Sequence, residues 1–325
     1  MPNVTRQRLK VRAKYLRTAR AYFDAQNVLE VETPILSNRA VTDPHVNCIR
    51  AGSKLFLRPS PEYALKQLLA QGSGDIYEIG RVFRDGEAGS RHNPEFTMAE
   101  WYRINFKLRQ IISDTVDFIT HLAATSPHPV TRVEQIQYTE LFRHVTQLDP
   151  LSASAETLAD YAMSKLADQL SPNLRKALGD DRQGWLDLLM SHHIEPKLTP
   201  DTLTVVTHYP AEQSLLARLS DEFPGTAERF EIYYRGYELA NGFHELADPQ
   251  EQRQRFLNDQ KIRASAGAQV PEIDEALLNA LKIGLPDCSG VAVGIDRLIM
   301  GCEGYRHISD ALALQPTGYK NAGQN

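Results

Sequence analysis

The first group of residues that could do chemistry lies between positions 84 and 96. Arg84 is followed by a polar, glycine-containing loop with Arg91, His92 and Asn93, and then by Phe96. A guanidinium group binds phosphate through two parallel hydrogen bonds, and the face of an aromatic ring can stack on a purine. This order predicts an ATP site, against the alternative of a solvated hairpin with scattered charges.

Two carboxylates, Glu231 and Glu238, form the second group. A hairpin that turns at Tyr234–Arg235 would place them directly opposite each other, where they repel unless a cation lies between them. Oxygen ligands of this kind select Mg²⁺, which commonly joins carboxylates to nucleotide phosphates. The alternatives are an exposed acidic pair, or a salt bridge to Arg229 or Arg235.

The third group is the string from Gly290 to Met300, which reads as a strand, then Gly294, then a helix. A glycine lets a ligand approach the backbone closely. Arg297 adds its charge to a helix N-terminus, which already favours anions. Asp296 could cap this helix or hold Arg297, and the alternative for the whole string is a turn into a core helix.

Hydrophobic periodicity predicts the elements that must position these groups. Helices are predicted over residues 5–27, 62–71, 107–124, 248–264 and 273–282, with a polar helical stretch over 150–198. Strands are predicted over 28–33, 55–58, 75–84, 95–102, 202–208 and 291–293, with a further hairpin over 229–243. Long hairpins flanked by helices favour an α+β fold with an antiparallel sheet.

Alternation along the first hairpin assigns its side chains to two faces. The outgoing strand carries Glu78, Gly80, Val82 and Arg84 on one face, and Tyr77, Ile79 and Phe83 on the face toward the core. The returning strand carries Phe96, Met98, Glu100 and Tyr102 on one face. We therefore expect Arg84 and Phe96 to face the same cleft.

Composition narrows the class of protein. Of the 325 residues, 42% are hydrophobic, which is enough for a packed core and argues against disorder. The net charge of -5 argues against bulk nucleic-acid binding. Three widely spaced cysteines predict free thiols in a reducing compartment. The start of the chain lacks the apolar region of a signal peptide, and no apolar run is long enough for a membrane span, so we expect a cytoplasmic protein.

In this order the strings resemble the three motifs of class II aminoacyl-tRNA synthetases. Pro34 matches motif 1, residues 83–96 match motif 2, and residues 294–297 match motif 3. RHNPEFTM and ELANGFHEL are similar to strings of lysyl-tRNA synthetases. The resemblance implies the class II catalytic fold in one domain over residues 1–325, with a helical insertion or connecting region near 150–198. It also implies a homodimer built through motif 1.

The resemblance assigns roles by matching position. Arg84 and Arg297 would be the catalytic residues, and Arg84 would hold the α-phosphate and the carboxylate that is activated. The ATP site would consist of Arg84, Asp85, Gly86, His92, Asn93, Phe96, Glu238, Leu239, Gly294 and Arg297, with Glu231 and Glu238 on Mg²⁺. The amino-acid site would consist of Ser60, Pro61, Glu62, Glu100, Tyr102, Asn241, Glu245 and Ala292.

The acidic residues of this set agree with the chemistry of a diamino acid. Each of its two ammonium groups needs a buried acceptor, which Glu62 would provide for the amine near the carboxylate and Glu245 for the distant one. One position departs from the family pattern, because motif 2 usually reads Phe-Arg-x-Glu and this chain has Gly86 there, with Glu87 one residue later. A shift of the loop could let Glu87 take that place.

Within the class, the chain is similar to the elongation factor P (R)-β-lysine ligases at EWYR, at His244 and at PDCSGVA. Ala292 falls where the synthetases tend to have glycine, which would reshape the amino-acid pocket. The chain also has no room for the anticodon-binding domain that precedes the catalytic domain of lysyl-tRNA synthetases. The resemblance implies activation of (R)-β-lysine or lysine by ATP and transfer to elongation factor P.

Three alternatives remain at this point. A truncated synthetase would act on tRNA, and an asparagine synthetase of the same fold would need basic groups where this chain has Glu62 and Glu245. A non-catalytic paralogue would bind and regulate, but it would be expected to lack Arg84, Glu238 or Arg297, and all three are present.

Overall fold

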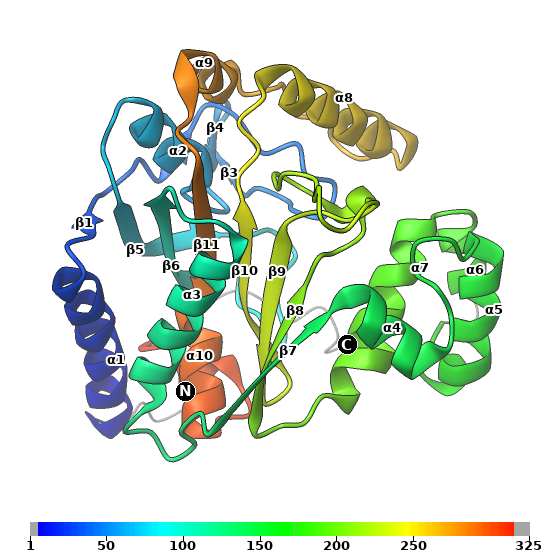
Figure 1. Cartoon of the computed structure of the whole chain (residues 1–325), viewed down its shortest axis with the longest axis horizontal. Coiled ribbons are helices and arrows are strands. Elements are labelled where there is room, and N and C mark those ends of the chain that lie inside the picture. The colour runs from blue at the N-terminus through cyan, green and yellow to red at the C-terminus, as the bar shows by residue number, and fades with distance from the viewer. Residues whose placement is uncertain (1–5, 172, 315–325) are drawn as a thin grey trace. The chain divides into compact units, whose positions relative to one another are not determined.

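The computed structural model describes residues 6–171 and 173–314, so the first residue of the predicted helix over 5–27 lies outside the described residues. The chain forms two compact units (Figure 1). The first comprises the described residues of Met1–Pro129 and Leu239–Asn325, and the second comprises Val130–Glu238. The sequence predicted a single domain. Whether the two units form one domain depends on how they are joined, so this stays a prediction.

The main strands of the first unit are those of the predicted hairpin and three others. They are β1 (Leu29–Glu30), β5 (Ile76–Phe83), β6 (Glu95–Ile104), β11 (Cys288–Gly294) and β10 (Tyr237–His244), in that order, with β10 counted from Leu239 in this unit. The pairs β5–β6, β6–β11 and β11–β10 are antiparallel, as predicted. The edge strand β1 is parallel to β5, because the chain crosses over between them through a helix.

One face of this sheet packs against α1 (Arg6–Ala25) and α3 (Leu108–Ala123). The ring of Phe23 stacks on Tyr77 at a centroid distance of 4.1 Å and on Phe118 at 5.2 Å. Trp101 lies on the same side, 5.0 Å from Phe118. The prediction that Tyr77 points into the core is confirmed.

The remaining elements of the first unit include the helix that carries the predicted Glu62. They are α2 (Glu62–Ala70), α8 (Pro249–Ser265), α9 (Glu275–Gly284), α10 (Ile295–Glu303), a short 3₁₀ helix (Ile308–Asp310) and a small sheet of β2 (Leu36–Ser37), β3 (Arg50–Ala51) and β4 (Leu55–Leu57). Helix α2 packs against α9 (Figure 1). Of the predicted strand over 28–33, only β1 is a strand in the structure.

The second unit contributes three strands and has its own core. Strand β7 (Arg132–Gln137) pairs in parallel with β8 (Thr202–Thr207), which pairs antiparallel with β9 (Arg229–Tyr234). Between β7 and β8 the chain forms the helices α4 (Tyr138–Thr146), α5 (Ala155–Leu166), α6 (Leu174–Leu178) and α7 (Arg182–Leu189). The same stretch contains short 3₁₀ and π turns (Ala167–Gln169, Met190–Ile194, Glu195–Lys197). Another 3₁₀ turn (Ala211–Gln213) follows β8. The predicted helical stretch over 150–198 is largely helical in the structure. Trp185 of α7 and Phe142 of α4 are buried in the core of this unit.

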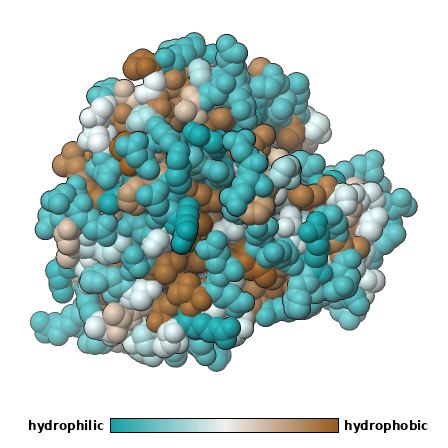
Figure 2. All heavy atoms as spheres, viewed as in Figure 1, coloured by the Kyte–Doolittle hydropathy of each residue, from teal (hydrophilic) through white to brown (hydrophobic). Residues whose placement is uncertain are grey.

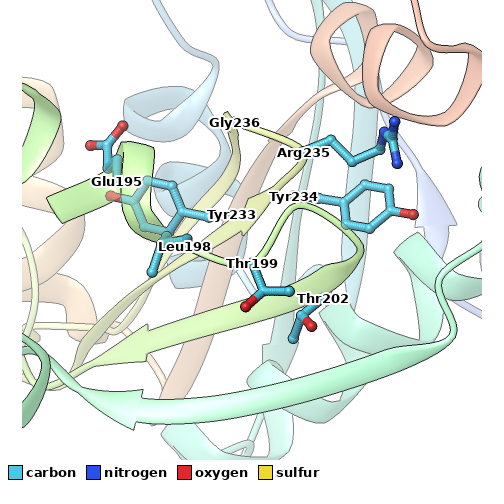
Figure 3. Close-up of a pocket in the computed structure, with 8 residues that line it drawn as sticks. All are labelled: Glu195, Leu198, Thr199, Thr202, Tyr233, Tyr234, Arg235 and Gly236. Atoms are coloured by element: carbon cyan, nitrogen blue, oxygen red, sulfur yellow. The ribbon is translucent and has the colours of Figure 1, made fainter.

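A small pocket in the second unit lies beside the end of β9 (Figure 3). Thr199, Thr202 and Tyr234 contribute to its lining, and none of the predicted site residues does. Hydrophilic side chains cover much of the face drawn in Figure 2. Among the helices of residues 6–171 and 173–314, none is both long and apolar enough to cross a membrane.

Candidate active site

The second face of the first unit's sheet gathers most of the predicted site residues. Strand register pairs Glu100 with Ala292, and Ala292 with Asn241, in a row across β6, β11 and β10. Tyr102 and Gly290 form the next row. Directly paired residues project to the same face, so these side chains share one surface, opposite the one that α1 and α3 cover. The predicted alternation along β6 is confirmed.

The nucleotide end of this face is built around Arg84, which follows β5. Its guanidinium carbon lies 5.2 Å from the centre of the Phe96 ring, so these two residues do face each other. Nη1 lies 3.4 Å from Oε1 of Glu87, and Nε lies 3.4 Å from the carbonyl oxygen of Pro59. The pairing brings Glu87 next to Arg84, and whether Glu87 takes the role of the family's glutamate stays a prediction. Gly86 adopts a φ of +79°, which disfavours any side chain, and the carboxylate stands one residue later.

Motif 3 meets motif 2 at this end. Arg297 Nε donates a hydrogen bond of 3.4 Å to the carbonyl oxygen of Arg91. Partial desolvation lowers the pKa of His92, and the charges of Arg297 and Arg84 lower it further. Arg91 and Arg297, which are 206 positions apart in the chain, therefore contribute to one positively charged surface. Such a surface suits the phosphates of a nucleotide.

Two other predicted ATP residues shape the loop between β5 and β6. Asn93 is buried, and its amide nitrogen donates to the carbonyl oxygen of Glu95 at 2.5 Å. Asp85 accepts a hydrogen bond from the backbone nitrogen of Gly86 at 3.0 Å, and its own nitrogen donates to Asn47 at 2.8 Å. A contact of either side chain with ATP stays a prediction.

Asp296 does not have either role that the sequence suggested. Its Oδ2 accepts a hydrogen bond of 2.6 Å from the backbone nitrogen of Thr97, and its Oδ1 forms an ion pair with Arg12. Arg12 also donates to the hydroxyl of Thr97 at 2.6 Å. Asp296 thus ties the start of α10 to β6 and α1. Arg12 is one of several basic residues on the predicted helix, and nothing in the sequence distinguished it from the others or indicated a partner so far along the chain.

The amino-acid end of the same face is strongly acidic. Ser60 and Pro61 lead into α2, whose first residue is Glu62, and the Ser60 hydroxyl accepts from the Glu62 backbone nitrogen at 2.9 Å. Glu100 accepts hydrogen bonds from the hydroxyls of Ser60 at 2.7 Å and Tyr102 at 2.9 Å. All of these residues were predicted from the sequence.

The third carboxylate, Glu245, reaches this pocket from the end of β10. Its Oε2 lies 2.6 Å from the ammonium nitrogen of Lys66, which also donates to Glu62 Oε1 at 2.8 Å. A β-carbon on Gly290 would lie 2.3 Å from Cε1 of Tyr102 and 2.8 Å from Oε1 of Glu245. Only glycine leaves room for both side chains. Sequence reasoning missed this role of Gly290, and it also missed the contact of Lys66 with Glu62 and Glu245.

Burial makes these carboxyl groups weak acids. Desolvation, with the charge of Glu62, raises the pKa of Glu100 to about 8. Desolvation also raises the pKa of Glu245 to about 7, while the ammonium group of Lys66 opposes that rise. Burial disfavours the charged form of Lys66, but the charges of Glu245 and Glu62 outweigh it and raise its pKa. The pocket therefore favours a cationic ligand that would ionise these carboxyl groups.

Comparison with known proteins decides the family. The family described as tRNA synthetases class II (D, K and N) matches residues 1–317. The chain belongs to this family. The class II fold predicted from the three motifs is thereby confirmed, and the assignment of Arg84 to motif 2 and of Arg297 to motif 3 stays a prediction.

Curated relatives within this class II family match nearly the whole chain. The elongation factor P–(R)-β-lysine ligase of Haemophilus influenzae strain PittGG is 41% identical over 322 residues, which cover 96% of each chain. The protein of the same name from Pasteurella multocida strain Pm70 is 40% identical over 330 residues, covering 99% of this chain and 98% of the relative.

The predicted class II metal pair needs one correction. The hairpin turns at Arg235 and Gly236, whose φ angles are +52° and +80°, between β9 and β10. A two-residue turn places Tyr233 opposite Glu238, so Glu231 is not directly opposed to Glu238 but lies one step further along the same face. The expected turn at Tyr234–Arg235 was one residue too early.

Glu231 also has other partners. It forms an ion pair with Arg229 and accepts hydrogen bonds from the hydroxyls of Tyr209, at 2.5 Å, and of Tyr233. Both carboxylate oxygens already have partners, which would compete with Mg²⁺ for Glu231 in this arrangement, and its role as a ligand stays a prediction. Within the described part of the chain, no group of three or more His, Cys, Asp or Glu side chains could hold a metal ion.

Proposed function

We propose that this protein is an elongation factor P–(R)-β-lysine ligase. It activates (R)-β-lysine, or lysine, with ATP and transfers it to the ε-amino group of a lysine on elongation factor P. The observation that carries the proposal is the acidic pocket of Glu62, Glu100 and Glu245 on the same sheet face as Arg84. Relatives with this name, 40–41% identical over nearly the whole chain, support it.

The charges of the pocket favour a diamino acid over other substrates of the class. Lys66 pairs with Glu62 and Glu245, Glu100 accepts only from hydroxyl groups, and the pocket has no second lysine or arginine among its described contacts. An amino acid with a carboxylate side chain, as asparagine synthetase requires, would be repelled here. A substrate with two ammonium groups gains an acceptor for each.

The proposed reaction has two steps. The carboxylate of the amino acid attacks the α-phosphorus of ATP, which forms an aminoacyl-adenylate and releases pyrophosphate. The uncharged ε-amino group of the acceptor lysine then attacks the carbonyl carbon, which forms an amide, loses a proton and releases AMP. Arg84 would stabilise charge at the α-phosphate and Arg297 at the distal phosphates. His92, with its lowered pKa, would be a neutral hydrogen-bonding group beside them.

Mg²⁺ accompanies ATP in this proposal as a counter-ion of the phosphates. Because Glu231 is held by Arg229, Glu238 is the carboxylate that we expect to bind the ion. Glu238 is partly exposed, and no step of the mechanism above depends on it.

The proposed enzyme is a cytoplasmic homodimer. Apolar side chains near motif 1 support the dimer, because Leu29 is 57% exposed, Leu36 49% and Ile35 42%. Exposed apolar groups that lie close together in the sequence are typical of a surface that a partner covers. An acceptor that serves translation places the enzyme in the cytoplasm. The net charge of -5 makes tRNA a poor main partner.

The mass of intact elongation factor P tests the proposal. The factor is incubated with the enzyme, ATP and either (R)-β-lysine, (S)-β-lysine or L-lysine. We expect the mass of one aminoacyl residue to be added, most rapidly with (R)-β-lysine, and no addition with Arg84→Ala. An unmodified factor beside a tRNA that has been charged with lysine would contradict the proposal and favour the truncated synthetase.

A further inference from the structure

Lys66 is a buried cation that the reaction proposed above does not use. Its side chain is 2% exposed, and its ammonium nitrogen lies 2.8 Å from Glu62 Oε1 and 2.6 Å from Glu245 Oε2. Glu62 is one turn earlier on α2, whereas Glu245 follows β10, almost two hundred residues further along the chain. Lys66 therefore joins two elements at the floor of the acidic pocket.

The position of Lys66 is informative because its two partners, Glu62 and Glu245, are the proposed acceptors of the substrate's ammonium groups. The proposed function assigns Glu62 to the amino group near the substrate carboxylate and Glu245 to the distant amino group. A single internal ammonium group bridges both acceptors. Burying a lysine is costly unless it is paired, so such a residue needs a compensating role.

Counting charges shows what that role could be. Glu62, Glu100 and Glu245 contribute three negative charges when ionised, and Lys66 cancels one of them. The two remaining negative charges match the two ammonium groups of a diamino acid. Glu245 Oε1 is buried and has no hydrogen-bond partner within residues 6–171 and 173–314, so one acceptor is left for a ligand.

We propose that Lys66 is a positioning residue that determines substrate specificity, because it limits the pocket to two unbalanced negative charges and holds Glu62 and Glu245 in place for a diamino acid. This inference rests on the proposed function and adds a residue to it. Lys66 acts through the two carboxylates and is not expected to touch the reacting atoms.

Charged and titratable groups face the bridge from several elements, and Asp287 lies behind them, 2.8 Å from Nε2 of His244. Glu62 lies on α2, Glu100 and Tyr102 lie on β6, and His244 and Glu245 lie at the end of β10. The ammonium group of Lys66 opposes protonation of Glu245. Without it, the pKa of Glu245 rises, and the ionised pocket that binds a diamino acid forms only at higher pH.

The test compares ATP–pyrophosphate exchange with (R)-β-lysine or lysine between pH 6 and 9.5. For Lys66→Met we expect the acid limb of kcat/KM to move up by about one pH unit and KM at pH 7 to rise about tenfold, at a similar kcat with saturating substrate. Lys66→Arg keeps the charge, so its acid limb is expected to remain at the wild-type position. Arg103→Met is the matched control, because it removes a cation of β6 whose ion pair with Asp75 lies outside the pocket.

Two further measurements separate the charge from the stability of the fold. In Lys66→Ala, ethylammonium ions are expected to restore exchange several-fold by filling the vacated space, with no gain in Arg103→Met. In the double variant Lys66→Met with Glu62→Gln, the pocket again has two negative charges. Its acid limb is expected to return to the wild-type position, although KM stays raised because Glu62 is lost.

The inference would be overturned by a folded Lys66→Met variant with wild-type KM and pH profile. It would also be overturned if the acid limb of the double variant stayed about one pH unit above that of the wild type, the full shift expected for Lys66→Met, instead of returning to the wild-type position, and this criterion applies even if Lys66→Met alone does not fold. Failure of the proposed function would look different, because wild-type enzyme would then show no exchange with any diamino acid.

Discussion

The ring of Tyr102 crosses β11 at Gly290, with which it is paired in the sheet. A β-carbon at Gly290 would lie 2.3 Å from Cε1 and 2.5 Å from Cδ1 of that ring. The glycine thus lets Tyr102 reach Glu100, to which its hydroxyl donates at 2.9 Å. This relationship holds the amino-acid end of the site together.

Gly290→Ala is accordingly expected to displace Tyr102 and Glu245. The new methyl group overpacks a buried site, so we expect a loss of stability of about 1–3 kcal/mol and a KM for the amino acid that rises much more than the KM for ATP. Urea unfolding and ATP–pyrophosphate exchange measure the two effects. Equal increases in both KM values would mean that Gly290 does not act on the amino-acid end.

Arg84→Ala is expected to lower the rate of exchange by more than about 100-fold, because Arg84 is the cation proposed to hold the α-phosphate. Arg81→Ala is the control, since Arg81 lies on the same strand with a partly exposed side chain 3.5 Å from Glu95. The control should retain nearly full activity and stability. A similar loss in both variants would indicate damage to β5 and not the loss of a phosphate ligand.

Binding of a diamino acid is expected to release protons. The pKa of Glu100 is about 8 and that of Glu245 about 7, so both groups carry protons near neutral pH in the free enzyme. Two incoming ammonium groups favour the ionised carboxylates and lower both pKa values. The value of kcat/KM should therefore rise from pH 6 to about 8.5, and fall only when the amino groups of the substrate lose their protons near about pH 10.

Calorimetry measures this release directly. Titration of the enzyme with lysine at pH 7.5 in buffers of different ionisation enthalpy should give more than about half a proton released per molecule bound. Proton uptake on binding would contradict the prediction.

Glu231 and Glu238 are expected to respond differently to neutralisation. Glu231→Gln leaves the buried Arg229 without its counter-charge and should lower stability by about 3 kcal/mol, with an unchanged Mg²⁺ requirement. Glu238→Gln should raise the Mg²⁺ concentration needed for half-maximal exchange, without affecting stability. Exchange titrated with Mg²⁺ and thermal unfolding separate the two. A raised Mg²⁺ requirement in a stable Glu231→Gln variant would show that Glu231 is a ligand after all.

Local patterns were sufficient for much of the fold. The helix over residues 107–124 is α3 (Leu108–Ala123), and the first hairpin is β5 and β6, because hydrophobic periodicity reports which face of an element is buried. The same alternation placed Glu100 and Tyr102 on one face before any register was known. Short elements such as β2 and β3 were missed, since two residues carry no periodic signal.

The register of the second hairpin was beyond this kind of reasoning. A turn at residues 235–236 or at 234–235 fits the apolar pattern about equally well, but the choice decides whether Glu231 or Tyr233 opposes Glu238. Only the backbone conformation, with positive φ at both Arg235 and Gly236, makes that choice.

By itself, the sequence determined the order of the three motifs, the alternation of the strands and the residue types of the site, because these depend on neighbours a few positions apart. Only the tertiary structure decided which distant charges meet. Lys66 meets Glu245, and Arg12 holds Asp296. An ion pair between residues far apart in the sequence leaves no local sequence pattern, since the attraction between two charges depends on their distance in space and not on their separation along the chain.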